Sequence, residues 1–409
     1  MVGWSVLEFS MNSTIKARIG WQGLTTAEYL KEGYAYLVTG TDFLNGKIYW
    51  EKCHYVNKNR YYQDSNIQLV NGDILITKDG TIGKVALVKS LDKKATLNSG
   101  IFVVRPKNEL YDRTFMYHIL NSHVFENFLS KLAAGSTINH LYQKDFIKFE
   151  FEAPENIIEQ RAIASALSDA DEYIASLENL IKKKRAIKQG AMQELLTGKR
   201  RLPGFEGEWV EKKIFEIGHT SSGGTPSRSV PAYYMGSIPW VTTSELNDNY
   251  INSTIEKISS EALNNSSAKL FPKGTVLMAM YGATIGRLGI LNIEAATNQA
   301  CCAMFFEKNI DEKFMYYLLL INRSKIIEQG SGAGQPNISQ SIVKNLTFII
   351  PKILDEQTAI ANILSDMDKE IDSLIEKLSK ARQIKQGMMS ELLTGRIRLI
   401  EESAGNGQN

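Results

Sequence analysis

The sequence predicts an α+β fold with two similar α/β domains, each followed by a long helix, and with the two helices paired as a coiled coil. Three observations predict it. Residues 159–202 return as residues 356–399 without a gap, and about 26 of the 44 aligned positions are identical. Both copies carry apolar residues at alternating steps of four and three, and a strand-rich segment precedes each copy. Self-similarity at a fixed offset indicates a duplicated structural unit.

The repeated segment has the pattern of a coiled-coil helix. Steps of four and three place the apolar residues on one face, which is the a/d seam of a coiled coil. Pro154 and Pro351 precede the two copies, and Gly198 and Gly395 follow them, as is usual at helix boundaries. The alternative is that the two helices are unrelated and lie in separate cores. The residues that we expect to pair the helices are Ile163, Leu167, Ile174, Leu177, Ile360, Leu364, Ile371 and Leu374.

The globular segments correspond more weakly than the helices do. Strands between Gly, Asn and Asp turns are typical of a mixed α+β domain. Three pairs of segments match, mainly at glycines and apolar strand positions: 33–42 with 236–245, 72–84 with 274–287, and 134–141 with 331–338. We therefore expect domains at 1–155 and 203–353, helices at 156–202 and 354–400, and a disordered tail at 401–409.

Charge and composition narrow the classes of function. With 47 Lys and Arg against 45 Asp and Glu, the net charge of +2 excludes a polycation, and 43% apolar residues exclude a disordered chain. Three cysteines cannot build a disulfide scaffold; we expect Cys301 and Cys302 to be buried thiols, and Cys53 to bind no metal. The chain shows neither a secretion signal nor an apolar run long enough for a membrane, so we expect a cytoplasmic protein.

Motifs of catalysis are missing from the sequence. It has no Asn/Asp-Pro-Pro-aromatic motif of amine methylation, no Gly-x-Gly-x-x-Gly cofactor loop and no Walker A loop. The five histidines form no pattern of metal ligands. We therefore expect no catalytic residue, no metal and no cofactor in this chain.

Short motifs open and close each copy of the repeat. Residues 159–164 and 356–361 share Glu-Gln-x-Ala-Ile-Ala, and residues 194–198 and 391–395 share Glu-Leu-Leu-Thr-Gly. This layout resembles the specificity subunit of type I restriction–modification systems, and the resemblance covers nearly the whole chain. Further segments of the second half carry the same resemblance: 238–245, 281–287 and 334–338.

The resemblance implies a function in DNA recognition. The globular segments would be two target recognition domains separated by an antiparallel pair of helices, and each would read one half of a split, asymmetric site in double-stranded DNA. Two methyltransferase subunits would dock on the helices, and restriction subunits would join them. The chain would be a non-catalytic subunit. S-adenosylmethionine, ATP and Mg would belong to the partner subunits only.

DNA reading needs cations for phosphates and bidentate side chains for base edges. Two loops, 80–84 and 282–287, combine glycines with a basic residue, so we expect Lys84 and Arg287 to meet phosphate or guanine. An amide pair near the last strand of the second domain could read adenine, and the polar run 16–22 adds cations and an amide to the first domain. The full set of candidate DNA contacts is Arg18, Gln22, Lys78, Thr81, Lys84, Thr242, Tyr281, Thr284, Arg287, Gln335 and Asn337.

Each candidate group also has a structural alternative. The basic loops could be hairpin turns whose charge faces water, the amide pair a capped turn shaped by Pro336, and the run 16–22 a solvated loop. The basic run 182–185 is either a solvated helix face or a contact to phosphate or to an acidic methyltransferase surface. The competing function is a coiled-coil scaffold with two ligand-binding domains and no DNA role. An enzyme is the third class, which the missing motifs disfavour.

Overall fold

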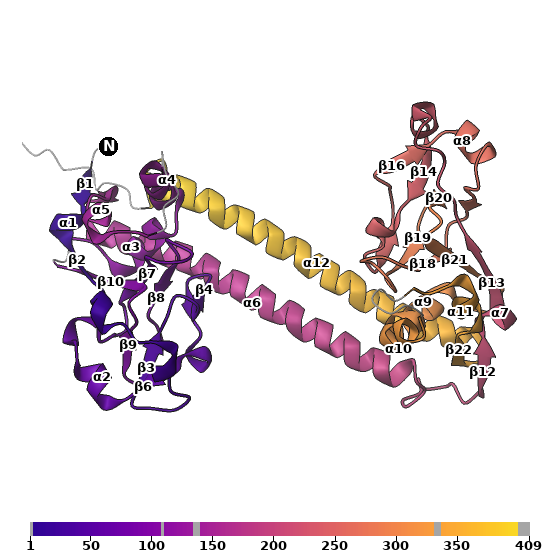
Figure 1. The fold of residues 1–409 in the computed structure, drawn as a ribbon, viewed down its shortest axis with the longest axis horizontal. Helices are drawn as coiled ribbons and strands as arrows, with labels where there is room; N and C mark the ends of the chain where they lie inside the picture. The colour runs from indigo at the N-terminus through magenta and orange to yellow at the C-terminus, as the bar shows by residue number, and fades with distance from the viewer. Residues whose placement is uncertain (1–2, 108–109, 134–139, 331–336, 400–409) are drawn as a thin grey trace, which may run out of the picture. The chain divides into compact units, whose positions relative to one another are not determined.

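The computed structural model describes residues 3–107, 110–133, 140–330 and 337–399. The expected tail at 401–409 lies outside these residues. The chain divides into two compact units, each holding one globular domain and parts of both long helices (Figure 1). The first unit consists of Met1–Glu178 with Glu376–Asn409, and the second consists of Asn179–Ile375.

The described residues of the first unit form four small sheets with helices packed on them. The sheets have the strand orders β1-β11, β2-β10-β7-β8, β6-β3-β9 and β4-β5. The strands are β1 (Trp4–Glu8), β2 (Ser13–Lys16), β3 (Ala35–Val38), β4 (Phe43–Leu44), β5 (Lys47–Ile48), β6 (His54–Val56), β7 (Ile74–Thr77), β8 (Val85–Leu87), β9 (Ala95–Leu97), β10 (Ile101–Pro106) and β11 (Glu150–Pro154). The helices of the domain are α1 (Phe9–Asn12), α2 (Lys58–Tyr62), α3 (Arg113–Leu120), α4 (His123–Ala133) and α5 (Gln143–Phe146).

The second unit repeats this plan, and two of its sheets have one strand more than their counterparts in the first unit. Its sheets have the strand orders β12-β22, β13-β21-β18-β19-β15 and β16-β14-β20-β17. The strands are β12 (Trp209–Lys213), β13 (Gly218–Ser222), β14 (Ile238–Val241), β15 (Asn249–Ile251), β16 (Glu256–Ile258), β17 (Leu270–Phe271), β18 (Val276–Ala279), β19 (Leu288–Leu291), β20 (Ala295–Thr297), β21 (Cys301–Phe306) and β22 (Thr347–Pro351). The helices are α7 (Ile214–Ile217), α8 (Ser260–Asn264), α9 (Glu312–Ile321), α10 (Arg323–Glu328) and α11 (Gln340–Asn345).

The strand pairings confirm the predicted pseudo-symmetry of an α+β fold. In both domains the first strand pairs antiparallel with the last: β1 with β11, and β12 with β22. In both, a central strand lies between a parallel and an antiparallel neighbour: β3 between β9 and β6, and β14 between β20 and β16. In Figure 1, the sheet that holds β14 and β16 lies away from α12, whereas α9 lies beside α12.

The two long helices are α6 (Ile157–Leu195) and α12 (Leu354–Leu392), with 39 residues each. At a rise of 1.5 Å per residue, each is about 58 Å long. Both helices end before a glycine in the left-handed region, Gly198 and Gly395, each with φ of 69°. This conformation favours glycine and stops a helix.

The helices also form part of the domain cores. In the first unit, seam residues of α6 share one apolar cluster with Met389 and Leu392 of α12 and with Phe115 of α3. In the second unit, seam residues of α12 share a cluster with Met192 and Leu195 of α6. Among the residues expected to pair the helices, Ile174 is half-buried. The buried ones are Ile163, Leu167, Leu177, Ile360, Leu364, Ile371 and Leu374.

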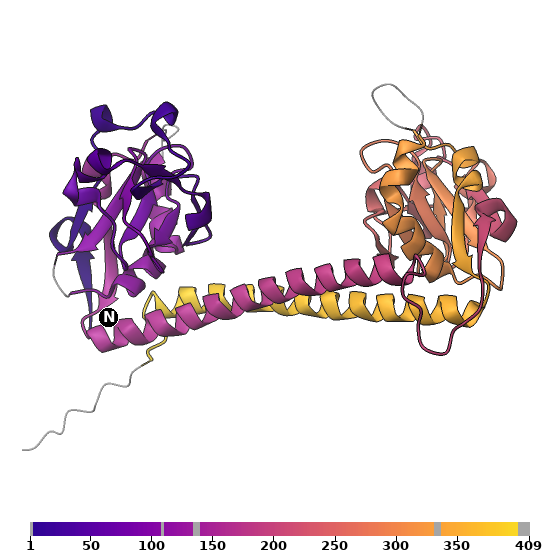
Figure 2. The same cartoon turned by 90° about the horizontal axis from the view of Figure 1, so that it is seen from below.

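Ion pairs between the helices show that they run antiparallel. In the first unit, Asp171 pairs with Lys385. In the second unit, Asp368 pairs with Lys188, which is the same pair at the repeated positions. Within each unit the helices lie side by side (Figures 1 and 2). The predicted antiparallel coiled coil is confirmed.

A buried carboxylate lies at the start of each long helix. Glu356 is fully buried, and Arg201 binds it with Nε and Nη2 at 2.6 and 2.8 Å. Glu159 is 1% exposed, and Arg398 binds it in the same way at 2.5 and 2.7 Å. Each pair joins the start of one long helix to the segment that follows the end of the other. The duplication has therefore preserved the ion pair and exchanged its partners between the two copies.

A buried histidine packs α3 against α6 in the first unit. The Nε2 atom of His118 lies 3.2 Å from the hydroxyl of Ser168. Burial lowers the pKa of His118 to about 4, with Lys385 and Lys89 acting in the same direction and Asp171 opposing them. The native unit therefore keeps this imidazole neutral. At the corresponding place of the second unit, a tyrosine hydroxyl donates to the carboxylate of the repeated aspartate at 2.7 Å.

We predict that removing the arginine from one buried pair strongly destabilises its unit. Arg201→Ala leaves the carboxylate of Glu356 buried without its cation, which lowers the free energy of unfolding by about 3–5 kcal/mol. The matched control is Arg200→Ala, because Arg200 pairs with Glu194 on the surface and its loss should change less than about 1 kcal/mol. Urea unfolding measures both; equal effects of the two substitutions would contradict the prediction.

We also predict an acid-sensitive contribution from His118. Its native pKa of about 4 lies below the ordinary value of 6.5, so the unfolded chain binds the proton first as the pH falls. The stability is present above about pH 6.5 and is lost toward pH 4. Between pH 7.5 and pH 5, the wild type should lose about 2 kcal/mol more than His118→Gln. Urea unfolding at each pH tests this, and parallel curves for the two proteins would contradict it.

Candidate nucleic-acid interface

Four loop segments meet at one edge of the second domain. The N–H of Asn298 donates to the carbonyl of Val241 at 3.0 Å, which joins the turn between β20 and β21, just before β21, to the end of β14. The N–H of Met280 donates to Ala300 at 2.9 Å, and the N–H of Ile338 donates to Met280 at 2.8 Å. The loop after β18 is thus fixed between the turn before β21 and the segment before α11.

The first domain has the same backbone framework. Asn98 donates to Val38 at 3.0 Å, Lys78 to Gly100 at 3.0 Å, and Leu141 to Lys78 at 2.8 Å. The two domains therefore place equivalent loops together with equivalent main-chain hydrogen bonds. The side chains that these loops carry differ, because Lys78 stands where the second domain has a methionine.

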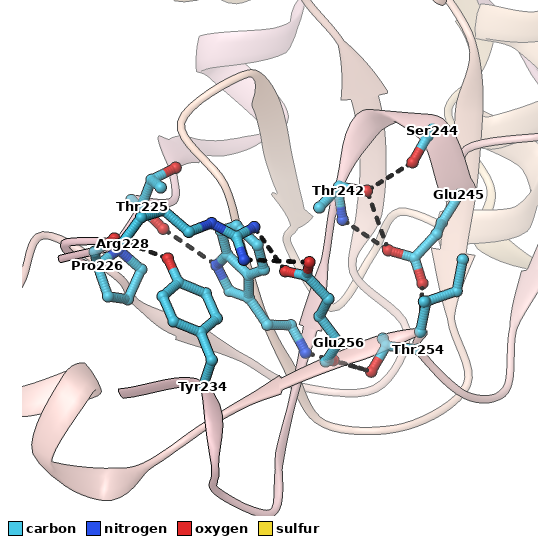
Figure 3. A network of polar contacts seen from close by, with 12 residues as sticks. Thr225, Pro226, Arg228, Tyr234, Thr242, Ser244, Glu245, Thr254 and Glu256 are labelled. Carbon is cyan, nitrogen blue, oxygen red and sulfur yellow. Dashed lines mark hydrogen bonds and ion pairs between the residues drawn. The ribbon is translucent and has the colours of Figure 1, made fainter. Parts of the chain in front are cut away.

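A turn closed by an acidic residue follows the central strand of each domain. In the second domain, Glu245 accepts the N–H of Thr242 at 2.8 Å and that of Ile255 at 2.9 Å. The hydroxyl of Thr242 lies 2.7 Å from that of Ser244, and Figure 3 shows this network. In the first domain, Asp42 accepts the N–H of a threonine at 2.7 Å, and burial raises the pKa of Asp42. The predicted contact Thr242 is thus already held in its turn.

Glycines shape the two basic loops. Gly83 and Gly286 have φ of 80° and 73°, which favours glycine. A Cβ on Gly83 would lie 2.4 Å from a side-chain carbon of Leu129, and one on Gly286 would lie 3.0 Å from Ile327. These loops are therefore packed closely against helices α4 and α10. The sequence indicates their glycines, but only the structure shows what the glycines approach.

The basic residues of the first loop are half-buried. The Nζ atom of Lys84 donates to the carbonyl of Gly40 at 3.4 Å, and its N–H donates to the hydroxyl of Thr77 at 2.9 Å. The Nζ atom of Lys78 lies 4.0 Å from Asp79. Thr81 is exposed, and its carbonyl accepts the hydroxyl of Thr77 at 2.5 Å.

The second loop presents more of its predicted residues to solvent. Arg287 is exposed, and its guanidinium lies 3.3 Å from the carboxylate of Asp248. Tyr281 is exposed as well, whereas Thr284 is half-buried and its carbonyl accepts the N–H of Arg287 at 2.9 Å. Asn337 is exposed beside this loop; Gln335 lies outside the described residues.

Arg18 is buried, which argues against its predicted contact with DNA. Its side chain is 1% exposed, and its Nε donates to the carbonyl of Leu97 at 2.8 Å. Two further donors bind Thr96 and Gln63 at 3.2 and 3.3 Å, and burial lowers the pKa of Arg18. A guanidinium enclosed in this way has no surface for a phosphate, so Arg18 is a structural residue in this conformation. Gln22, four residues later in the chain, is half-buried.

A polar network that the sequence did not predict lies beside the turn of Thr242. Arg228 forms a bidentate ion pair with Glu256 and stacks on Tyr234 (Figure 3). The two charged residues are 28 positions apart, so no local pattern announces the pair. The cue that was present is the run Gly-Gly-Thr-Pro-Ser-Arg-Ser at 223–229, which combines turn residues with a cation.

The described part of the chain contains three buried cysteines and no group of residues suited to a metal ion. Within it, no group of three or more His, Cys, Asp or Glu could hold a metal ion, and no helix is long and apolar enough to cross a membrane. Cys53, Cys301 and Cys302 are buried and free. Burial raises the pKa of Cys53 and of Cys302 to about 12, so both stay protonated.

Comparisons with known proteins agree with this architecture. The family described as type I restriction modification DNA specificity domain matches residues 23–189 and 206–385. The MjaVIII specificity subunit of Methanocaldococcus jannaschii is 26% identical over 398 residues, which cover 90% of this chain and 87% of that protein. The EcoR124I/EcoR124II specificity subunit of Escherichia coli is 28% identical over 186 residues, or 44% of this chain and 46% of that protein.

A solved structure shares the fold over nearly the whole length. The S subunit of a type I restriction–modification system from M. genitalium superposes with a TM-score of 0.63 at 18% identity, covering 95% of this chain and 96% of that one. Two family matches, each spanning one globular domain and much of one long helix, account for most of the sequence. The chain therefore belongs to the DNA specificity proteins of type I restriction–modification systems.

Proposed function

We propose that this chain reads a split, asymmetric DNA site, with one half-site for each globular domain, as part of a type I methyltransferase and restriction complex. The observation that carries the proposal is the shared loop framework with different side chains. Lys78 of the first domain and Met280 of the second make the same main-chain hydrogen bonds but carry different side chains. Two copies of one scaffold with different surfaces suit two different half-sites.

The charge of the chain supports a division of labour within the complex. A net charge of +2 gives weak neutralisation of phosphates, and this neutralisation provides most of the affinity of non-specific binding. We therefore assign specificity to this chain and much of the electrostatic attraction to its methyltransferase subunits. S-adenosylmethionine, and ATP with Mg for restriction, would be bound by the partners, and this chain would act without chemistry of its own.

The function is tested by sequencing modified bases in cells. A host that carries this gene with its methyltransferase gene should show one split motif, methylated on both strands, that is absent when this gene is deleted. The matched control keeps the methyltransferase gene alone. Methylation that does not depend on this chain, or a complex that binds DNA without sequence preference, would favour the scaffold alternative.

The long helices are proposed to set the gap between the two half-sites. One heptad inserted after Glu178 and one after Ile375 lengthens both helices and keeps the seam in phase. The gap in the methylated motif should grow by about 10 Å, or roughly three base pairs, with both half-sites unchanged. A heptad in α6 alone is the control, because it puts the ion pairs of the helices out of register. Changed half-sites with the same gap would contradict the proposal.

One exposed surface occurs on both long helices and fits a protein partner. Ile187 and Ile384 occupy the same place in the repeat and are 48% and 54% exposed. Gly190 and Gly387 follow on each helix, and a Cβ on either would meet no atom within 4 Å. A glycine inside a helix costs about 1 kcal/mol relative to alanine. Because each surface pairs a half-exposed isoleucine with a helical glycine that faces open space, we assign the two surfaces to two methyltransferase subunits.

We predict that each surface binds one methyltransferase subunit. Ile187→Glu or Ile384→Glu should reduce the stoichiometry from two subunits to one, and the double variant should bind none. Native mass spectrometry of the co-purified complex measures this. Leu180→Lys is the matched control, because the second helix already has a lysine, Lys377, at the corresponding place. Two bound subunits on the double variant would contradict the prediction.

A further inference from the structure

A loop of the second domain, residues 223–229, is fixed over the end of β14. The indole Nε1 of Trp240 donates to the carbonyl of Gly224 at 3.1 Å, and the hydroxyl of Tyr234 donates to that of Pro226 at 2.7 Å. The N–H of Gly224 donates to Thr297 at 2.9 Å. This loop therefore has a defined position on the strand ends.

Two glycines make this close approach possible. A Cβ on Gly223 would lie 2.0 Å from the carbonyl oxygen of Thr297, and one on Gly224 would lie 2.3 Å from the backbone of Ser267. Both contacts are with main chain, which cannot move aside as a flexible side chain can. The loop is thus seated on the sheet by backbone fit.

The loop adjoins the interface described above. Thr225 is hydrogen-bonded to Gln299, which belongs to the turn before β21 (Figure 3 shows Thr225 beside Arg228). On the other side, Thr254 and Glu256 flank Ile255, whose N–H donates to Glu245 of the turn after β14. The hydroxyl of Thr254 donates to the carbonyl of Glu256. The loop and that turn therefore lie on the same edge of the domain.

Arg228 is held in one orientation by this loop. Its Cζ lies 4.0 Å from the centre of the Tyr234 ring and 5.4 Å from that of Trp240. Its Nη1 and Nη2 donate to the two carboxylate oxygens of Glu256 at 3.1 and 2.7 Å. The arginine side chain is nevertheless 56% exposed. Stacking and a bidentate pair together fix a guanidinium that still faces solvent.

The pair leaves donors free and cancels the charge. A guanidinium has five N–H groups, and Glu256 engages the end of the fork. Among the described residues, none accepts a hydrogen bond from the Nε of Arg228. A phosphate would meet the carboxylate as well as the cation, so the pair gains little from it. A neutral base edge with two acceptors, O6 and N7 of guanine, accepts the remaining donors without that repulsion.

The first domain has a comparable pair with no such opening. Arg60 of α2 binds Glu28 with Nε and Nη2, and its Nη1 donates to Gln63 at 3.0 Å. All three nitrogens of that guanidinium are engaged, and the hydrogen bond from Arg60 lowers the pKa of Glu28. Of these two comparable arginines, Arg228 of the second domain is therefore the one whose Nε is not engaged by a described residue.

We propose that Arg228 reads a guanine in the half-site of the second domain, with Glu256 and the Tyr234 ring holding the guanidinium in the reading orientation. This inference rests on the proposed function and adds to it a residue, a base and a half-site. Glu256 and Tyr234 are positioning residues, because they act on the base through Arg228.

The first test compares methylated motifs in cells. Arg228→Ala and Arg228→Lys should relax one G·C position of one half-site, with discrimination reduced about 5- to 150-fold, and leave the other half-site unchanged. Glu256→Gln should relax the same position to a smaller extent. Lys257→Gln is the matched control, because Lys257 is exposed on the same strand and should leave the motif unchanged.

The second test removes a single atom from the DNA. Duplexes with 7-deazaguanine at the relaxed position lack the N7 acceptor; they should be methylated more slowly by the wild-type complex and at an unchanged relative rate by the Arg228→Ala complex. Thermal unfolding of each variant checks that the second domain is folded. If Arg228→Ala is unfolded, Glu256→Gln serves as the test variant.

The outcomes separate this inference from the function on which it rests. An unchanged motif in the Arg228 variants, or a uniform loss over all sites as for a phosphate contact, would overturn the guanine assignment. A wild-type chain that directs no sequence-specific methylation would overturn the proposed function instead. Relaxation at one position that Glu256→Gln shares supports both the base contact and the positioning role.

Discussion

A carboxylate that is removed from water needs a cation beside it, and each half of this chain buries one at the start of its long helix. Glu356 and Glu159 meet this need with Arg201 and Arg398, which follow the ends of the opposite helices. Unpaired burial of either charge would cost several kcal/mol. Because a pair forms only when the start of one helix lies beside the end of the other, these contacts specify an antiparallel arrangement more strictly than an apolar seam can.

The paired long helices also form part of the cores of the two domains. The apolar clusters that contain the helix seams also contain strands of the domain cores, such as β7 and β18, whereas the central strands β3 and β14 pack in separate clusters. On this base, main-chain hydrogen bonds give both domains the same loop positions. Side chains outside that framework, such as Lys78 and Arg228, are free to differ. A common main-chain framework that carries different side chains allows one fold to read two different sequences.

The sequence predicted the repeated helices well, but it gave no sign that Arg18, a candidate DNA contact, is buried. The helix seam follows a period of three and four, and Ile163 and Ile360 are buried as that period requires. Arg18 shows the limit, because a cation in a polar run looks exposed until Thr96 and Leu97 are seen to enclose it. The pairing of Arg228 with a distant glutamate has no periodic signal at all. Contacts between residues far apart in the chain, rather than local propensity, decide such positions.

The first unit is discontinuous in the chain, since the whole second unit lies between its two segments. This has a consequence for biosynthesis. During translation, Glu159 emerges early but waits for Arg398, whereas Arg201 and Glu356 lie within one continuous stretch. The second unit can therefore complete its buried pair while the first still has an unmatched carboxylate. The first domain is therefore synthesised first but completed last. If translation stops shortly before residue 398, the first unit lacks Arg398, and its buried Glu159 has no cation beside it.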